Sequence, residues 1–136
     1  MIHPRVMPDY KIGSTHQFEH LRTAYNADPQ QEDDAHFLLW RGEEILALCL
    51  RHKYNPKPDE VWVGNAEAVA RWGERLAALK GKQTVPLYYS PRSRTLFEYR
   101  GQQLITGESV DPKELTARKG PVPLSRIVYL KGVTGS

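Results

Sequence analysis

Apolar residues recur at helical spacing in two segments of the chain. The first segment predicts a helix over residues 15–25, with Ser14 as the N-cap and Gln17 able to complete a capping box. The second predicts a longer helix over residues 66–80, which Asn65 would cap. The apolar positions are Phe18, Leu21 and Tyr25 in the first segment and Val69, Trp72, Leu76 and Leu79 in the second. Both helices are thus expected to be amphipathic.

Two apolar runs on either side of a short polar turn predict a β-hairpin between Phe37 and Leu50. The turn is Arg41-Gly42-Glu43, in which Gly42 can take the positive φ that a tight turn requires. The run from Ile45 to Leu50 is almost continuously apolar, as expected of a strand that is buried on both faces. The loop that follows contains two prolines within residues 55–59, and neither has an N–H group to donate.

Further strands follow, separated by turn residues. The predicted strands cover residues 61–63, 84–89, 94–106 and 125–130, and a short helix or turn covers residues 110–118. Pro86 suggests an edge strand, and Gly101 suggests a β-bulge. Short turns between the strands favour antiparallel pairing. The sequence therefore predicts one α+β domain over residues 1–136, a curled β-sheet or small barrel with two main helices packed on it.

Composition is typical of a globular protein. Hydrophobic residues make up 40% of the chain and charged residues 26%, which favours a folded core over disorder. No apolar run reaches the roughly 18 residues of a transmembrane helix, and residues 1–13 lack the apolar segment of a secretory signal. The single cysteine, Cys49, lies in an apolar run and is expected to be a buried, inert thiol. We therefore expect a cytoplasmic protein with no membrane partner.

Charge is distributed unevenly along the chain, although the net charge is only +3 at pH 7. Residues 1–60 contain ten acidic and seven basic residues, whereas residues 61–136 contain six acidic and twelve basic residues. The C-terminal part can therefore present a cationic surface to phosphate groups. The alternative is that dispersed lysine and arginine side chains only keep the domain soluble.

One metal-binding pattern is present. Residues 16–20, HQFEH, match H-x-x-E-H, in which two histidines on one helix face hold zinc and the glutamate activates a bound water. The pattern needs a third protein ligand, and no helix with an acidic ligand follows it. We therefore expect two exposed histidines on a short helix. A metal-dependent hydrolase that uses His16, Glu19 and His20 remains an alternative. No other catalytic pattern occurs, and we expect a binding domain rather than an enzyme, without catalytic residues, metal or cofactor.

Basic and aromatic residues are interleaved, as is typical of nucleic-acid binding, because arginine neutralises phosphate and a tyrosine ring stacks on a base. The expected phosphate ligands are Arg51, Lys53, Arg92, Arg94 and Arg100. The expected stacking residues are Tyr88, Tyr89 and Tyr99, with Trp62 as a candidate that a core position would explain equally well. A flipped base also needs a polar group that reads its edge, and Asn55 is the candidate. Phe97 and at least one of the two adjacent tyrosines are expected to belong to the core.

Four segments resemble, in order, the motifs of a domain that is often attached to bacterial nucleases. The segments are YKIGSTHQFEHL, NPKPDEVWVGNAEAVARWGERL, VPLYYSPRSRTLFEYRGQQLI and LSRIVYLKGV, and together they extend from residue 10 to residue 133. The chain therefore resembles PUA-like domains of the SRA/EVE type, as found in bacterial modification-dependent restriction proteins. It departs from the pattern at Gln103, where the family has an aromatic residue. That change implies either an altered base pocket or a differently packed barrel.

The resemblance implies a barrel whose mouth takes a flipped or modified base, such as a modified cytosine, and which does no chemistry itself. It implies DNA as the partner, in defence against foreign or phage DNA, with cleavage by a fused or associated nuclease. Two alternatives stay open besides the metal hydrolase. The first is an RNA-binding PUA-like module, which competition between DNA and RNA of one sequence would distinguish from a DNA-binding domain. A protein-interaction module that dimerises through the hairpin would bind independently of salt.

Overall fold

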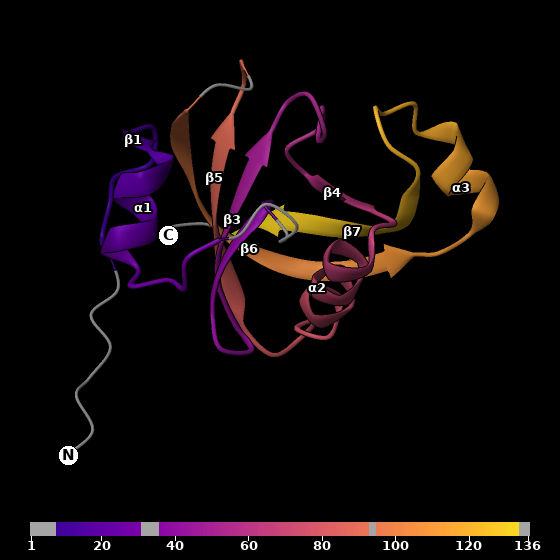
Figure 1. The fold of residues 1–136 in the computed structure, drawn as a ribbon, viewed down its shortest axis with the longest axis horizontal. Coiled ribbons are helices and arrows are strands. Elements are labelled where there is room, and N and C mark those ends of the chain that lie inside the picture. The colour runs from indigo at the N-terminus through magenta and orange to yellow at the C-terminus, as the bar shows by residue number, and fades with distance from the viewer. Residues whose placement is uncertain (1–7, 31–35, 93–94, 134–136) are drawn as a thin grey trace.

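One curled sheet organises the molecule. In the computed structural model, which describes residues 8–30, 36–92 and 95–133, seven strands form this sheet and three helices pack around it (Figure 1). The elements are β1 (Thr15–Gln17), α1 (Phe18–Ala24), β2 (Leu38–Arg41), β3 (Glu44–Arg51), β4 (Glu60–Gly64), α2 (Glu67–Ala77), β5 (Thr84–Ser90), β6 (Leu96–Ser109), α3 (Pro112–Ala117) and β7 (Leu124–Gly132). The strand order is β2-β3-β5-β6-β7-β4, and β1 pairs with β6 outside this path. Only β3 and β5 pair in parallel among the described strands. The predicted α+β class is confirmed.

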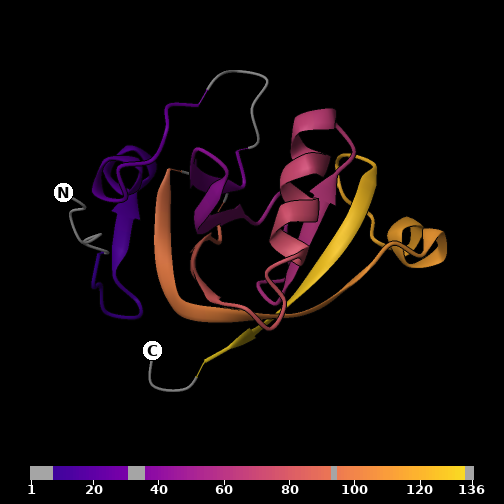
Figure 2. The same cartoon turned by 90° about the horizontal axis from the view of Figure 1, so that it is seen from below.

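The curl of the sheet follows the long strand β6, which bends strongly in Figure 2. β6 is 14 residues long and pairs with β5 through its first part and with β7 through its second. Gly101 in β6 has a φ of 87°, and the β5–β6 register shifts opposite it, between Pro86 and Tyr88. The predicted bulge is thus confirmed, since glycine takes this φ without steric cost. The result is a half-barrel whose ends, β2 and β4, do not pair with each other within the described residues.

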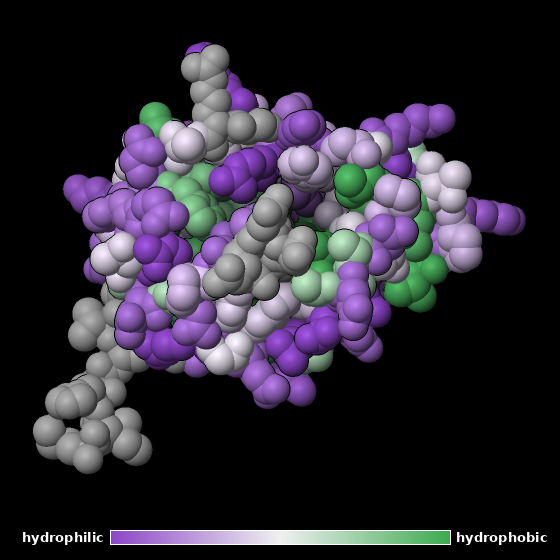
Figure 3. Space-filling model, in the orientation of Figure 1, coloured by the Kyte–Doolittle hydropathy of each residue, from purple (hydrophilic) through white to green (hydrophobic). Residues whose placement is uncertain are grey.

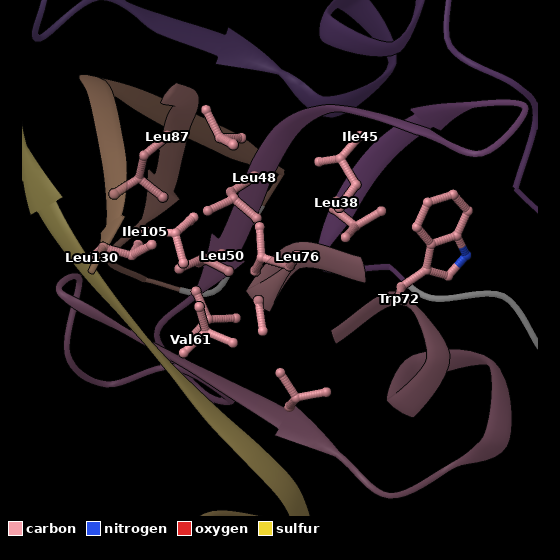
Figure 4. Packing of buried hydrophobic residues seen from close by; sticks show 14 of the residues in the cluster. Leu38, Ile45, Leu48, Leu50, Val61, Trp72, Leu76, Leu87, Ile105 and Leu130 are labelled. Carbon is pink, nitrogen blue, oxygen red and sulfur yellow. The ribbon is translucent and has the colours of Figure 1, made fainter. Parts of the chain in front are cut away.

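Both faces of the sheet are covered by helices. On one face, α2 packs on β4, β6 and β7, and a cluster that includes Leu50 and Leu76 is buried there (Figure 4). On the other face, a second cluster gathers around Leu21 of α1. Consecutive residues of β5 enter different clusters, Tyr88 the one with α1 and Tyr89 the one with α2. A strand in this position is therefore apolar on both sides.

The predicted hairpin is confirmed by β2 and β3, and Gly42 in its turn has a φ of 61°. Residues 45–50 are all buried, as their continuous apolar run indicated. Cys49 is 1% exposed, and burial raises the pKa of its thiol to about 12. The thiol is therefore protonated and inert at neutral pH, as predicted. No helix of the described residues is both long and apolar enough to cross a membrane.

A glycine lets α2 approach β4 closely. A Cβ atom at Gly73 would lie 2.4 Å from Cγ1 and 2.9 Å from Cγ2 of Val63. Any larger residue would have to push the helix away from the strand. The short connection from Gly64, which ends β4, to Glu67, which begins α2, then places the first turn of the helix beside the end of the strand.

The predicted helix over residues 15–25 is wrong at its start. Residues 15–17 form β1 and pair with β6, so the helix covers only the later part of this segment. Ser14 is not the N-cap, because Gln17 occupies that position without a side-chain bond. The Ser14 hydroxyl instead lies 2.8 Å from Nε2 of His16. Pairing with β6 satisfies the backbone groups of residues 15–17, which a helical start would have left to a cap.

Two local expectations also fail. Asn65 is not the N-cap of α2, since Ala66 holds that position and makes no side-chain cap bond. Pro86 is not on an edge strand, since β5 lies between β3 and β6. The missing N–H of Pro86 is tolerated because the parallel pairing with β3 begins only after it, at Leu87. The remaining predicted strands and helices are present with shifted ends.

Candidate functional site

A pocket with a volume of about 620 Å³ opens between the two ends of the curled sheet. Phe37, just before β2, and Arg51, the last residue of β3, line it from one end, and Trp62 of β4 lines it from the other. The other lining residues are His36, Tyr54, Asn55, Gly64, Asn65, Ala66, Val69, Val122 and Pro123. Pockets of roughly 300–1,000 Å³ are typical of sites for small organic groups.

Asn55 is almost fully buried beside this pocket, with 2% of its surface exposed. Its Oδ1 accepts a 2.7 Å hydrogen bond from the backbone N–H of Trp62, and its backbone oxygen accepts a 2.7 Å bond from the Tyr89 hydroxyl. Because a backbone N–H can only donate, the first bond fixes which end of the amide is oxygen. The amide nitrogen, Nδ2, has no hydrogen-bond partner among the described residues. Asn55 thus offers two N–H donors at the pocket.

Trp62 forms a fixed aromatic wall of the pocket. Its indole Nε1 donates a 2.9 Å hydrogen bond to Oε1 of Glu60. A Cβ atom at Gly120 would lie 3.3 Å from Cε3 of the indole, so the backbone at this glycine is in close contact with the ring. The ring is thereby held at its edge and on one side, and only 9% of the residue is exposed.

Positive charge borders the pocket without matching negative charge. None of the described residues that line the pocket is acidic. The Arg51 guanidinium lies 4.9 Å from the ring centroid of Phe97 and 5.5 Å from that of Phe18. Within the described part of the chain, neither Arg51 nor Arg92 pairs with a carboxylate. We call Arg51 and Arg92 the rim. Their positive charges can attract anionic groups.

Two other predicted phosphate ligands, Lys53 and Arg92, follow the ends of β3 and β5. Arg51 is opposite Ser90 in the parallel β3–β5 pair. The turn that carries Arg92 therefore begins beside the end of β3, although Arg92 itself lines a separate, smaller hollow with Glu98 and not the pocket of Trp62. Lys53 follows in the β3–β4 loop, with its ammonium group 5.4 Å from the ring centroid of Tyr54. The face of the molecule drawn in Figure 3 is largely hydrophilic, with smaller hydrophobic patches.

The three tyrosines that were predicted to stack on a base do not line the pocket. Tyr88, Tyr89 and Tyr99 are 1%, 3% and 7% exposed. The hydroxyl of Tyr88 lies 2.6 Å from that of Tyr25 inside the second core cluster. The expectation that these rings stack on a base is wrong, because both faces of β5 and of the first part of β6 are covered. Phe97, which was expected in the core, is fully buried.

Arg100 is not available as a phosphate ligand in the way that the sequence suggested. Its Nε lies 2.9 Å from Oε1 of Glu98 in an ion pair that lacks hydrogen-bond geometry, and its guanidinium lies 5.2 Å from the ring centroid of Tyr89. Arg94 lies outside the described residues. Gln103 is buried and does not line the pocket, so its departure from the domain pattern concerns packing within the sheet.

The H-x-x-E-H residues do not share one helix, because His16 lies in β1 and His20 in α1. The two rings stack with centroids 5.8 Å apart. Nε2 of His16 lies 2.8 Å from the Ser14 hydroxyl, and Nε2 of His20 lies 3.0 Å from the Tyr10 hydroxyl. Glu19 pairs with Arg22. The described residues contain no group of three or more histidine, cysteine, aspartate or glutamate side chains placed to hold a metal ion.

Sequence reasoning missed several lining residues of the pocket. Phe37 was assigned only to the hairpin, and Tyr54, which is 41% exposed, was not among the expected stacking residues. Its position between a basic residue and Asn55 was a usable signal. Val122 and Pro123 carried no signal, since only the fold brings their loop to the pocket.

The site thus combines an aromatic wall, a cationic rim and a buried amide whose N–H donors have no partner in the described part of the chain. These side chains come from four separate parts of the chain that the curl of the sheet brings together. No protein-family model, no curated protein and no solved structure matches this chain.

Proposed function

We propose that this chain is a DNA-binding reader that takes one base, flipped out of its strand, into the pocket beside Trp62 and Asn55. The observation that carries the proposal is the Asn55 amide, whose donors lie at the pocket and have no partner within residues 8–30, 36–92 and 95–133. A cytosine ring presents two acceptors, O2 and N3, that such an amide can bind. The indole of Trp62 supplies a flat surface on which any base can stack.

A modified cytosine suits the dimensions of the pocket. The volume of about 620 Å³ leaves room beyond a pyrimidine ring, and Val69 and Val122 offer apolar contacts to a substituent. The resemblance of residues 10–133 to PUA-like domains of the SRA/EVE type supports the same ligand. In this proposal the half-barrel is a PUA-like fold, and recognition of foreign DNA is coupled to cleavage by a fused or associated nuclease.

The first prediction concerns Asn55. Asn55→Asp keeps an oxygen for the Trp62 N–H but replaces the two donors with an acceptor. We expect affinity for the preferred modified duplex to fall about 10- to 100-fold, because a base acceptor then faces a carboxylate. The measurement is fluorescence anisotropy with duplexes that carry unmodified, methylated, hydroxymethylated or glucosylated cytosine, and with RNA of the same sequence.

The matched control is Asn65→Asp, which adds the same charge at an exposed residue that lines the same pocket. We expect this variant to lose less than the Asn55 variant. Equal losses in the two variants would mean that added negative charge, and not the missing donors, weakens binding. A parent protein that prefers no cytosine modification would contradict the proposed base, and tighter binding of RNA would replace DNA as the ligand.

The second prediction concerns the rim. Arg51→Gln combined with Arg92→Gln should weaken binding to all duplexes alike. It should also reduce the slope of log K against log salt concentration by about 0.9 per lost phosphate contact. The control is Arg71→Gln combined with Arg126→Gln, since these arginines already pair with Glu67 and Glu108. If both double variants reduce the salt dependence of binding equally, Arg51 and Arg92 are not specific phosphate contacts of the DNA.

A further inference from the structure

A partly buried ion pair lies behind the aromatic wall of the pocket. The two carboxylate oxygens of Glu60, which is 9% exposed, accept bonds from Nε of Arg118 at 3.3 Å and from its Nη2 at 3.2 Å. The Oε1 atom of the same carboxylate accepts the indole N–H of Trp62 at 2.9 Å. One carboxylate therefore joins the indole of β4 to the residue that follows α3.

Arg118 begins the segment that completes this wall. Gly120 contacts the indole, and Val122 and Pro123 line the pocket. The same two residues also line a second cavity, of about 410 Å³, which extends under the end of α3. Because this cavity leaves one side of the segment without close packing, packing alone does not hold the segment in place.

The anchors of the segment can be identified within the described residues. The backbone N–H of Asn65 donates to the Pro123 oxygen at 3.1 Å, which fixes the C-terminal end of the segment. At its N-terminal end, Arg118 bonds to the Glu114 oxygen of α3 and to Glu60. The bond to Glu114 is local to α3, so the pair with Glu60 is the link that ties this end of the segment to the sheet.

We propose that Glu60 and Arg118 are positioning residues that hold the Trp62 indole and the segment 118–123 together as one wall of the pocket. A guanidinium that meets a carboxylate through two bonds fixes both the distance and the plane of the contact. The inference rests on the proposed function for the ligand, a stacked nucleobase. The positioning itself is a property of the free protein and can be measured without DNA.

The charge state of the pair fits this role. Burial by itself raises the pKa of Glu60, but the bonds from Trp62 and Arg118, together with the charges of Arg118 and Lys57, outweigh it and lower the pKa below its usual value. The hydrogen bond to Glu60 contributes most to raising the pKa of Arg118. The pair therefore stays ionised at neutral pH.

The first measurement is the ¹⁵N–¹H resonance of the Trp62 indole in the free, full chain, assigned by its absence in Trp62→Phe. Glu60→Gln and Arg118→Met are expected to shift this resonance, while those of Trp40 and Trp72 stay in place. Arg118→Lys, which keeps the charge but not the two-bond geometry, is expected to restore only part of the original position. An indole resonance that is unmoved in both variants overturns the inference, whatever the DNA result.

The second measurement is affinity for the duplex that the parent prefers. Glu60→Gln makes the protein more positive, so charge alone would tighten DNA binding. Loss of the wall instead weakens binding about tenfold, equivalent to roughly half a base–aromatic stacking contact. Arg118→Met should weaken binding similarly without changing the salt slope. The control Arg71→Met, which breaks an exposed pair on α2, should bind as the parent does.

The two claims fail in different ways. Equal or tighter duplex binding by Glu60→Gln overturns the positioning role, and so does a flattened salt slope in Arg118→Met, which would make Arg118 a phosphate ligand. A parent that binds neither DNA nor RNA overturns the proposed function. In that case the indole resonance still decides whether Glu60 and Arg118 hold Trp62.

Discussion

Replacement of Trp62 by alanine is expected to reduce affinity for the preferred duplex by about 10- to 100-fold, because the stacking surface for the base is lost. The same change should lower the free energy of unfolding by about 3–5 kcal/mol, since the indole also fills space between β4 and Gly120. Anisotropy titration measures the first effect, and urea denaturation followed by circular dichroism measures the second.

A loss of stability this large can unfold a domain of this size, so a milder pair of variants separates the two effects. Trp62→Phe keeps an aromatic ring but loses the N–H that Glu60 accepts. Trp72→Phe makes the same change in the core beside Trp40, away from the pocket. We expect both variants to lose stability and only Trp62→Phe to lose affinity. Equal affinity in the two variants would mean that binding does not depend on the larger indole of Trp62 or on its bond to Glu60.

Gly73→Ala is expected to lower the free energy of unfolding by about 2 kcal/mol, although alanine in a helix usually stabilises by up to roughly 1 kcal/mol. The new methyl group would lie 2.4 Å from Cγ1 of Val63, so α2 and β4 would have to separate. Val63 is β-branched and cannot turn both methyl groups away. Steric overlap therefore outweighs the gain in helix propensity. Urea denaturation of the variant and the parent is the measurement.

Two further variants show whether the overlap with Val63 is the cause. Gly107→Ala places a methyl group where no heavy atom lies within 4 Å and should change stability by less than about 0.5 kcal/mol. Val63→Ala combined with Gly73→Ala should cost less than the sum of the two single changes, because the smaller side chain makes room. If the double variant is simply additive, the destabilisation has another origin.

The sequence alone predicted the parts of this fold that depend on local patterns. The hairpin of β2 and β3 follows from two apolar runs around a glycine turn, and α2 follows from one apolar stripe. Cys49 was expected to be buried because it lies in a continuous apolar run, and Gly101 was expected at a bulge because few other residues adopt its φ. Each of these features is determined by residues that are close together in the chain.

Asn55 and Tyr88 illustrate what the tertiary structure decided. Tyr88 was a candidate for stacking and Asn55 for reading the edge of a base, yet Tyr88 is buried in a core and Asn55 lies at the pocket. Side chains alternate between the two faces of a strand, but the sequence does not show whether one face or both are covered. The helices cover both faces of β5 and remove its tyrosines from the surface.

The same reason explains the start of the first helix and the composition of the pocket. Residues 15–17 were included in the first helix because Ser14 resembled an N-cap, but pairing with β6 makes them a strand. Val122 contacts the same cavity as Phe37 only because the sheet curls until its two ends approach each other. Local patterning thus determined most of the helices and strands, but not the start of the first helix. Contacts between distant segments decided which faces stay open, because burial depends on what packs against a surface and not on its own sequence.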